Sequence, residues 1–141
     1  MRFCSNLLAA FALLLVGCVL GTQVAVAQTI HISVSNIALK SGETMEFGNV
    51  YLISTDCRSL LTSTPEIEIM EGPPGVSVAI KQAMVVPRAW GCARPVSGGK
   101  MFIAAKDVED YSNSSMVLRI KYKTRDGDRL RSQRINVTLF P

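Results

Sequence analysis

The sequence predicts an all-β domain, folded as a single antiparallel β-sandwich of seven or eight short strands, after an N-terminal export signal. Apolar residues beyond position 28 recur with period two, as in strands that bury one face. Gly, Pro, Asn and Asp interrupt this alternation at short intervals, as turns do in sandwiches. A small barrel is the alternative architecture for the same strand pattern.

The first 27 residues have the pattern of a secretory signal peptide. Arg2 supplies a positive charge, residues 7–20 are apolar, and Ala25-Val26-Ala27 is a small-residue cleavage pattern. The apolar run is shorter than the about 20 residues of a transmembrane helix. We therefore expect cleavage after Ala27 and export to the periplasm or the extracellular space, which leaves residues 28–141 as one domain.

A second interpretation concerns the same segment. Leu15-Val16-Gly17-Cys18 resembles a bacterial lipobox, which would make the chain a lipoprotein anchored through Cys18. Apolar residues continue after Cys18, whereas lipoproteins turn polar there, so cleavage after Ala27 is favoured. That cleavage leaves two cysteines, Cys57 and Cys92, and we expect them to form a disulfide in an oxidising compartment.

The first half of the mature chain contains two predicted strands. Ile30, Ile32 and Val34 alternate with polar residues, which indicates a half-buried strand that residues 36–39 extend. A turn at residues 40–43 leads to a second strand over residues 44–54, which delivers Cys57 at its end. Gly48 lies inside that strand and predicts a β-bulge.

The middle of the chain contains three more predicted strands. Residues 66–69 alternate Glu and Ile, which indicates a strand with one charged face, and residues 71–75 predict a tight reversal. Residues 76–81 form the return strand, and residues 84–86 either continue it or form a separate strand. Residues 88–99 are irregular and contain Trp90 and Cys92, and residues 100–105 form the next strand.

The Gly-Pro-Pro-Gly-Val-Ser-Val segment at residues 72–78 resembles strand–turn–strand elements of bacterial immunoglobulin-like domains. The resemblance covers residues 66–80. It implies an immunoglobulin-like β-sandwich for residues 28–141. The cysteine pattern differs from that of antibody domains, in which the tryptophan lies on its own strand well between the cysteines. In this chain Trp90 lies two residues before Cys92.

The last two strands predict a hairpin. Residues 116–124 and 129–140 flank Asp126-Gly127, a strong hairpin signal. A two-residue loop at these positions pairs Leu118 with Ile135 and places the apolar residues of both strands on one face. The outward face then carries Arg119, Lys121, Lys123, Leu130, Ser132 and Arg134.

This hairpin is also a candidate binding surface, because its cations are crowded: Lys121, Lys123, Arg125, Arg129, Arg131 and Arg134. One interpretation is an anionic partner, such as lipid headgroups, a polysaccharide or an acidic protein. The other, which we favour, is that the charges protect a sheet edge against aggregation. Nucleic acid is not expected, because Tyr122 is the only aromatic side chain there for stacking on bases.

Trp90 with Arg88 and Arg94 is the second candidate surface. An aromatic residue flanked by arginines on a loop resembles a binding hot spot. The alternative, favoured by the adjacent Cys92, is that Trp90 packs over the disulfide and caps the core. In both cases the disulfide ties this loop to the end of the second strand, and that end of the domain is our first choice for a binding surface.

Catalytic patterns are not found in the sequence. His31 is the only histidine and alternates with isoleucines, which indicates a surface position on the first strand. There is no nucleophile elbow and no phosphate-binding glycine loop. The carboxylate pairs Glu66/Glu68 and Glu109/Asp110 are interpreted as solvated. Asp107, near the second pair, does not complete a calcium-loop pattern, so we expect no metal and no cofactor.

The expected function is therefore that of an exported bacterial binding module without enzymatic activity. The formal net charge of the whole chain is +4, and loss of Arg2 with the leader leaves 14 basic and 11 acidic residues, a mild excess of +3 that gives weak attraction to anionic surfaces. One alternative is a structural or assembly subunit of a cell-envelope complex, which would pair with another chain through an exposed sheet edge. The other alternative is an enzyme whose site the sequence does not reveal.

Overall fold

The computed structural model describes residues 35–141. The predicted signal peptide, the lipobox Cys18, His31 and the strand expected at residues 30–34 lie outside this range. The described part is all-β, as predicted, and no helix in it is long and apolar enough to cross a membrane. Its seven strands are β1 (Ser35–Lys40), β2 (Thr44–Val50), β3 (Glu66–Glu71), β4 (Val76–Val85), β5 (Val96–Ala105), β6 (Ser112–Thr124) and β7 (Gly127–Phe140).

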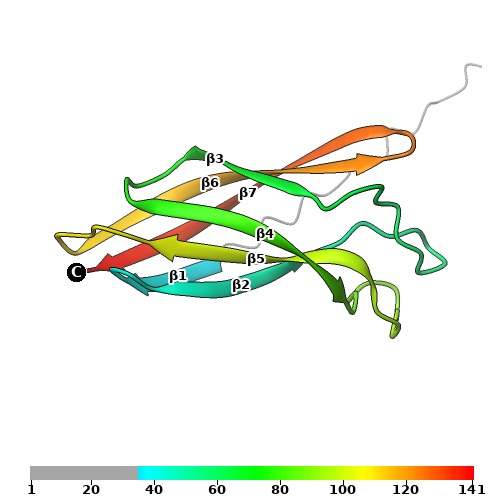
Figure 1. Ribbon diagram of the computed structural model, residues 1–141, viewed down its shortest axis with the longest axis horizontal. Coiled ribbons are helices and arrows are strands. Elements are labelled where there is room, and N and C mark those ends of the chain that lie inside the picture. Colours follow the sequence, from blue (N-terminus) through cyan, green and yellow to red (C-terminus); the bar gives the residue numbers. More distant parts are fainter. Residues whose placement is uncertain (1–34) are drawn as a thin grey trace, which may run out of the picture. The chain divides into compact units, whose positions relative to one another are not determined.

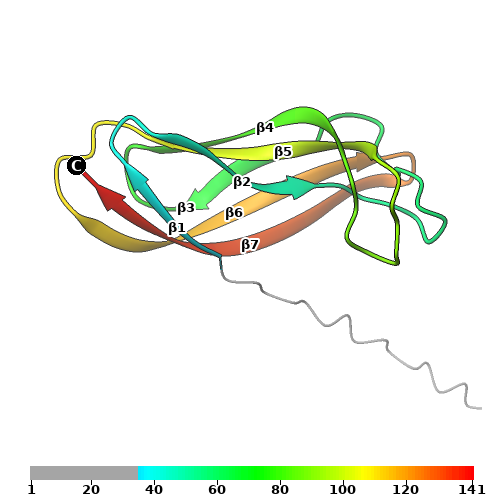
Figure 2. The same cartoon turned by 90° about the horizontal axis from the view of Figure 1, so that it is seen from below.

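The strands form two sheets that pack face to face (Figures 1 and 2). One sheet has the order β1-β7-β6-β3 and the other the order β2-β5-β4. Paired strands run antiparallel, except that β1 runs parallel to β7, so the prediction of an antiparallel sandwich was wrong for this one strand. At one side of the sandwich β1 lies beside β2, and at the other side β3 lies beside β4. Within residues 35–141 these four strands are the edges of the sheets.

β6 and β7 form the predicted hairpin, but the predicted register was wrong by two residues. Thr124 pairs with Gly127, so the loop is Arg125-Asp126, and Leu118 faces Gln133 in place of Ile135. The Thr124 hydroxyl closes this turn, because it donates to the Gly127 carbonyl over 2.7 Å. The predicted inward and outward faces are nevertheless correct, since a shift of two residues preserves the alternation of a strand.

β2 ends earlier than predicted, at Val50 in place of residue 54. After Val50 the chain folds back on itself, and Ile53 forms an isolated antiparallel bridge with Ser59. The predicted bulge is confirmed, because the pairing of β2 with β5 shifts between Glu46 and Gly48. β4 is longer than the predicted strand and continues without a break to Val85.

The turn that crosses from one sheet to the other, residues 72–75, depends on Gly75. Its φ is +75°, in the left-handed region, and a Cβ atom built there would lie 2.4 Å from the Lys106 carbonyl oxygen. The close approach brings the Gly75 carbonyl within 2.8 Å of the Lys106 N–H, which donates to it. Two of the connections at this end of the sandwich, residues 72–75 and 106–111, are therefore joined by a backbone hydrogen bond.

The main core lies between the sheets and contains the inward residues of the long strands. Its fully buried members are Leu39, Ile103, Met116, Leu118, Ile135 and Val137. A neighbouring cluster contains Val50, Met101, Ile120 and Tyr122. Burial of such side chains contributes roughly 1.5 to 3 kcal/mol each, so this layer is the principal source of stability.

Candidate functional site

Three connections between strands meet at one end of the sandwich, at the right of Figure 1. They are residues 51–65 between β2 and β3, residues 86–95 between β4 and β5, and the hairpin loop 125–126. They lie together because β2, β4 and β6 run toward this end while β3, β5 and β7 return from it. We call these three connections the disulfide pole.

The predicted disulfide is present and joins two of the three connections. Cys57 and Cys92 are bonded, with their Cα atoms 5.7 Å apart. Cys92 is buried in a small cluster with Ile53, Val85 and Val96. This cluster is separate from the core between the sheets, so the connections rest on apolar packing of their own.

Arg58 follows Cys57 and is held in a tight turn. The N–H of Ser54 donates to the Arg58 carbonyl at 2.9 Å, and the N–H of Cys57 donates to the Ser54 carbonyl at 3.0 Å. The Ser54 hydroxyl donates to the Asp56 carboxylate, and this hydrogen bond, with a smaller contribution from Arg58, lowers the pKa of Asp56. Arg58 Nε lies 3.0 Å from that carboxylate, and its side chain is largely exposed.

Trp90 lies at the tip of the β4–β5 connection and points into solvent. Its side chain is 66% exposed, so the favoured interpretation, that it caps the core, is wrong. Trp90 and Gly91 both have positive φ, +51° and +68°, and the Cys92 N–H donates to the Ala89 carbonyl at 3.1 Å. These are the features of a type I′ turn, in which the two central residues project from the chain.

Arg88 and Arg94 lie on the same connection and are exposed. The backbone N–H of Arg88 donates to the Tyr51 hydroxyl at 3.1 Å, which fixes the connection against the end of β2. Neither arginine forms an ion pair with a residue in the range 35–141. The structure therefore brings Arg88, Trp90 and Arg94 together, with both guanidinium groups available to a partner.

A groove runs between the β2–β3 connection and the tip of the hairpin. Three arginines line it, Arg58, Arg125 and Arg129, together with Asp126. The remaining lining residues are Ser54, Ser59, Leu60, Leu61 and Thr124. Guanidinium groups bind carboxylate or phosphate through paired hydrogen bonds, so a groove of this composition suits an anionic group.

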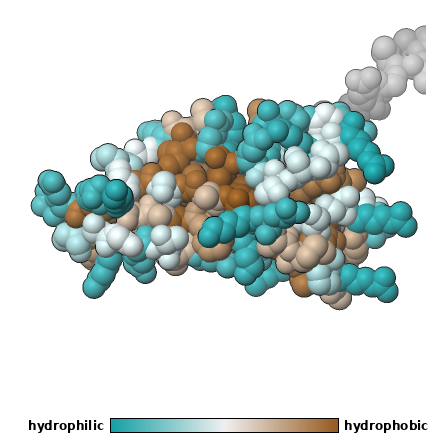
Figure 3. Space-filling view, viewed as in Figure 1, coloured by the Kyte–Doolittle hydropathy of each residue, from teal (hydrophilic) through white to brown (hydrophobic). Residues whose placement is uncertain are grey.

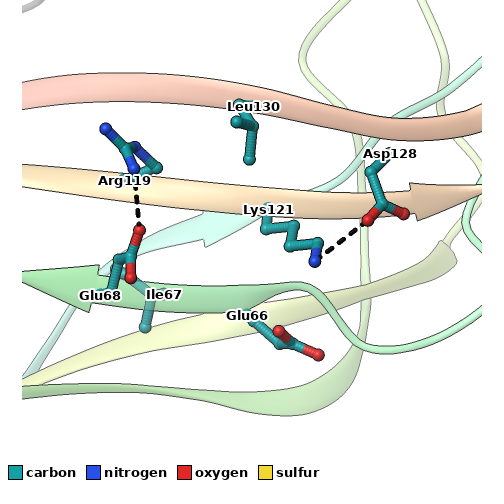
Figure 4. Close-up of a pocket in the computed structure, with 7 residues that line it drawn as sticks. All are labelled: Glu66, Ile67, Glu68, Arg119, Lys121, Asp128 and Leu130. Atoms are coloured by element: carbon teal, nitrogen blue, oxygen red, sulfur yellow. Dashed lines mark hydrogen bonds and ion pairs between the residues drawn. The ribbon is translucent and has the colours of Figure 1, made fainter.

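The cations on the outward face of the hairpin are mostly compensated (Figure 4). Lys121 Nζ lies 3.0 Å from Asp128, and Arg119 lies 3.3 Å from Glu68. Lys123 pairs with Glu66, which lowers the pKa of Glu66, and Asp128 raises the pKa of Lys121. The six hairpin cations therefore do not form one basic surface.

The remaining hairpin arginines lie on different sides of β7. Arg129 lines the groove, while Arg131 is opposite Ile120, on the side of the inward residues, and Arg134 is opposite Val117 on the outward face.

Arg58 was missed by sequence reasoning, although its position directly after Cys57 already placed it on the clamped connection. The glutamates of β3 were interpreted as a charged face, but their pairing with β6 could not be read from alternation.

Charge is segregated between the two ends of the sandwich. The disulfide pole contains four arginines, Arg58, Arg88, Arg94 and Arg125, and two aspartates, Asp56 and Asp126. The opposite end consists of the connections 41–43, 72–75 and 106–111, which we call the acidic pole. It contains four carboxylates, Glu43, Asp107, Glu109 and Asp110, and one cation, Lys106.

The acidic pole is not organised as a metal centre. Among the described residues, no three His, Cys, Asp or Glu side chains are grouped so that they could hold a metal ion. Pro73 and Pro74 line a shallow depression with Asp107, Glu109 and Asp110.

Comparisons of the chain with protein-family models, with characterised proteins and with solved structures found no match.

Proposed function

We propose that the protein is an exported, non-catalytic binding module with an immunoglobulin-like fold, and that its disulfide pole recognises a partner bearing carboxylate or phosphate groups. The single observation that carries this proposal is the gathering of exposed Trp90 and the arginines of three separate connections at one end of the domain. Tryptophan and arginine are the residues most enriched in binding hot spots.

The strand order supports the immunoglobulin-like assignment. In immunoglobulin domains strands B, E and D share one sheet and strands C, F and G share the other. In this chain the sheet β2-β5-β4 has the order B-E-D, and β3-β6-β7 has the order C-F-G. The disulfide pole then corresponds to the end at which immunoglobulin variable domains present their antigen-binding loops.

Export is supported by the leader pattern at residues 1–27 and by the disulfide. A bond between Cys57 and Cys92 persists in an oxidising compartment and is rare in the cytosol. Processing after Ala27 places the domain in the periplasm or outside the cell. Acylation of Cys18 would tether the same domain to a membrane. Mass spectrometry of the processed chain separates these outcomes, because a start at Gln28 and an acylated Cys18 have different masses.

The binding proposal is tested with poly-L-glutamate as an anionic probe. The double variant Arg88→Ala/Arg94→Ala is compared with Lys40→Ala/Lys106→Ala, which removes the same charge from exposed positions away from the disulfide pole. We expect the first variant to bind at least about tenfold more weakly and the second to bind like the natural protein, with affinity falling as salt rises. Trp90→Ala is expected to weaken binding further.

The control decides between a site and a general charge effect. Equal weakening by both double variants would mean that poly-L-glutamate reads net charge alone, and the disulfide pole would not be the binding surface. Thermal unfolding of each variant confirms that the fold is retained, because all four substituted side chains are exposed.

A further inference from the structure

Four sheet edges are present in the described domain, and three of them carry features that block pairing with another chain. β1 is short, with six residues. β2 is interrupted by the bulge at Gly48. β3 has Glu66, Glu68 and Glu71 and a register shift before Glu71. Short strands, bulges and charges are the usual protection of edges against intermolecular pairing.

The β4 edge has none of these features. Its ten residues pair with β5 without a register shift, and the strand contains no proline, no glycine and one charge, Lys81. On one side, β4 pairs with β5, and β2 lies beyond β5 in the same sheet. On the other side, no strand among residues 35–141 pairs with it. A long, regular and nearly uncharged edge is a template for an added strand.

An apolar seam accompanies this edge. Apolar side chains gather between β3 and β4, as the brown region of Figure 3 shows. Its residues are Ile67 and Ile69 of β3 and Val78 and Ile80 of β4, which are only partly buried against the core. A strand added to β4 from a second sandwich would bring a matching seam against this one and remove both from water.

From these observations we infer that the protein forms a symmetric dimer in which β4 pairs antiparallel with β4 of a second copy. Charge complementarity identifies the occupant. β4 begins at the acidic pole, where Lys106 and Asp107 both lie beside Gly75, and ends at the disulfide pole, before Arg88. The acidic pole as a whole still has four carboxylates against that one cation. Antiparallel pairing reverses the second copy, so the acidic pole of each copy lies alongside the arginines of the other. This inference does not depend on the ligand proposed for the disulfide pole.

The pattern of β4 also selects a register. The two-fold axis of such a dimer is perpendicular to the sheet, and the residue at the axis lies opposite the same residue of the second copy. With this arrangement the apolar residues of both copies lie on one face of the joined sheet: Val76, Val78 and Ile80. Axes through Ile80 and through Lys81 both pair nine of the ten residues. The axis through Lys81 places this cation opposite itself, which is destabilising. The axis through Ile80 places Lys81 opposite Ala79 of the second copy.

Ala79 therefore offers a matched pair of test variants. It is exposed on the outer face of the sheet, and Lys81 is held on that face by the Phe102 ring, whose centroid lies 4.7 Å from Lys81 Nζ. In Ala79→Lys a cation faces Lys81 of the second copy, and in Ala79→Glu a carboxylate faces it. The two-fold axis repeats this contact, so one substitution changes the electrostatic interaction at two places in the dimer.

Sedimentation equilibrium of the full chain, as processed by its own host, measures the dissociation constant of each form. We expect a reversible dimer, a dissociation constant about tenfold higher for Ala79→Lys, and an equal or lower constant for Ala79→Glu. Far-ultraviolet circular dichroism and thermal unfolding confirm that both variants fold. Raising the salt concentration is expected to weaken the dimer by screening the attraction between poles.

Three results would overturn the inference. A strictly monomeric natural protein at concentrations of about 100 μM would mean that the β4 edge does not pair, because the dissociation constant would then lie well above that concentration. A dimer unaffected by both variants would place the interface elsewhere. A dimer weakened equally by Lys and Glu at position 79 would exclude the register centred on Ile80.

Discussion

The disulfide pole and the acidic pole close the same sandwich in different ways. At the acidic pole the connections are short and bonded to each other through the backbone: the N–H of Gly42 donates to the Ala105 carbonyl at 2.9 Å, and the N–H of Ala105 donates to the Glu43 carbonyl at 3.0 Å. At the disulfide pole two long connections make most of their hydrogen bonds internally, as between Ser54 and Arg58. Between them lie the disulfide and one hydrogen bond, which the Arg88 N–H donates to the Tyr51 hydroxyl.

This difference shows how a small domain combines a rigid frame with an adaptable surface. Backbone hydrogen bonds between neighbouring connections leave little freedom for insertions or for new side chains. At the disulfide pole the bond between Cys57 and Cys92 and the small apolar cluster around it hold the base of the connections, and exposed side chains such as Trp90 are free to vary. Trp90 and the arginines lie on the connections that are constrained in this second way.

Removal of the disulfide is expected to have the largest effect. The variant Cys57→Ala/Cys92→Ala should lose roughly 3 to 4 kcal/mol of unfolding free energy on the chain-entropy estimate, because the bond closes a loop with a sequence separation of 35. Denaturant unfolding measures the loss. Hydrogen exchange should show that the amides of the two clamped connections lose protection relative to the rest of the domain. The amides of the acidic pole should keep their protection relative to the rest of the domain. Equal loss of protection at both poles would contradict the comparison.

Substitution of a glycine at each pole should have a smaller effect that differs between the poles. Gly75→Ala at the acidic pole combines positive φ with a clash against the Lys106 carbonyl, and we expect a loss of about 2 to 3 kcal/mol. Gly91→Ala at the disulfide pole also has positive φ, but no atom lies within 4 Å of the added Cβ, so about 1 kcal/mol is expected. Denaturant unfolding of the two variants provides the comparison.

The order of these two values is what matters for the comparison. If Gly91→Ala cost as much as Gly75→Ala, the turn at Trp90 would be as tightly packed as the crossing between the sheets. The disulfide pole would then not be the more adaptable end. If Gly75→Ala lost less unfolding free energy than an ordinary surface substitution, the backbone at Gly75 would not be constrained as proposed.

The smallest effect is expected from a tyrosine buried near the disulfide pole. Burial raises the pKa of Tyr122, with a smaller opposing effect of Arg131. A raised pKa means that the folded state holds the proton more tightly, so unfolding free energy should be constant below the ordinary value near 10 and fall as pH rises through the folded-state pKa. Urea unfolding measured over alkaline pH follows this loss.

Tyr122→Phe provides the control for the pH dependence. The phenylalanine cannot ionise, so its unfolding free energy should fall less steeply over the same alkaline range. An identical fall in both proteins would show that other groups cause the alkaline destabilisation, and that Tyr122 is not buried in solution as it is in the structure.

Much of the fold could be predicted because strands and turns leave local patterns. The alternation in β3 and in β6 identified both strands and their buried faces, and Gly48 identified the bulge. The hairpin register was not predictable to the residue, because Asp126-Gly127 fits both a loop at 126–127 and a loop at 125–126. The hydroxyl of Thr124, which closes the observed turn, carries no signal distinct from any strand threonine.

The candidate site was predicted in part. Cys57 and Cys92 were paired correctly because they are the two cysteines left by the expected processing, and the loop with Trp90 was placed at the clamped end. The orientation of Trp90 was not, since a buried and an exposed tryptophan have the same neighbours in sequence. Compensation of Lys121 and Lys123 was also missed, because Asp128 and Glu66 reach them only through pairing of strands.

Local patterns thus determined what each segment of this chain is: a strand with one apolar face, a turn, or a clamped connection. Two properties arose only when the strands were assembled into sheets. One is the segregation of charge into two poles, which collects residues from connections far apart in the chain. The other is the contrast between the protected edges and β4. Both depend on which strands become neighbours. Burial of apolar faces from distant segments sets that order, and the local alternation of residues does not indicate it.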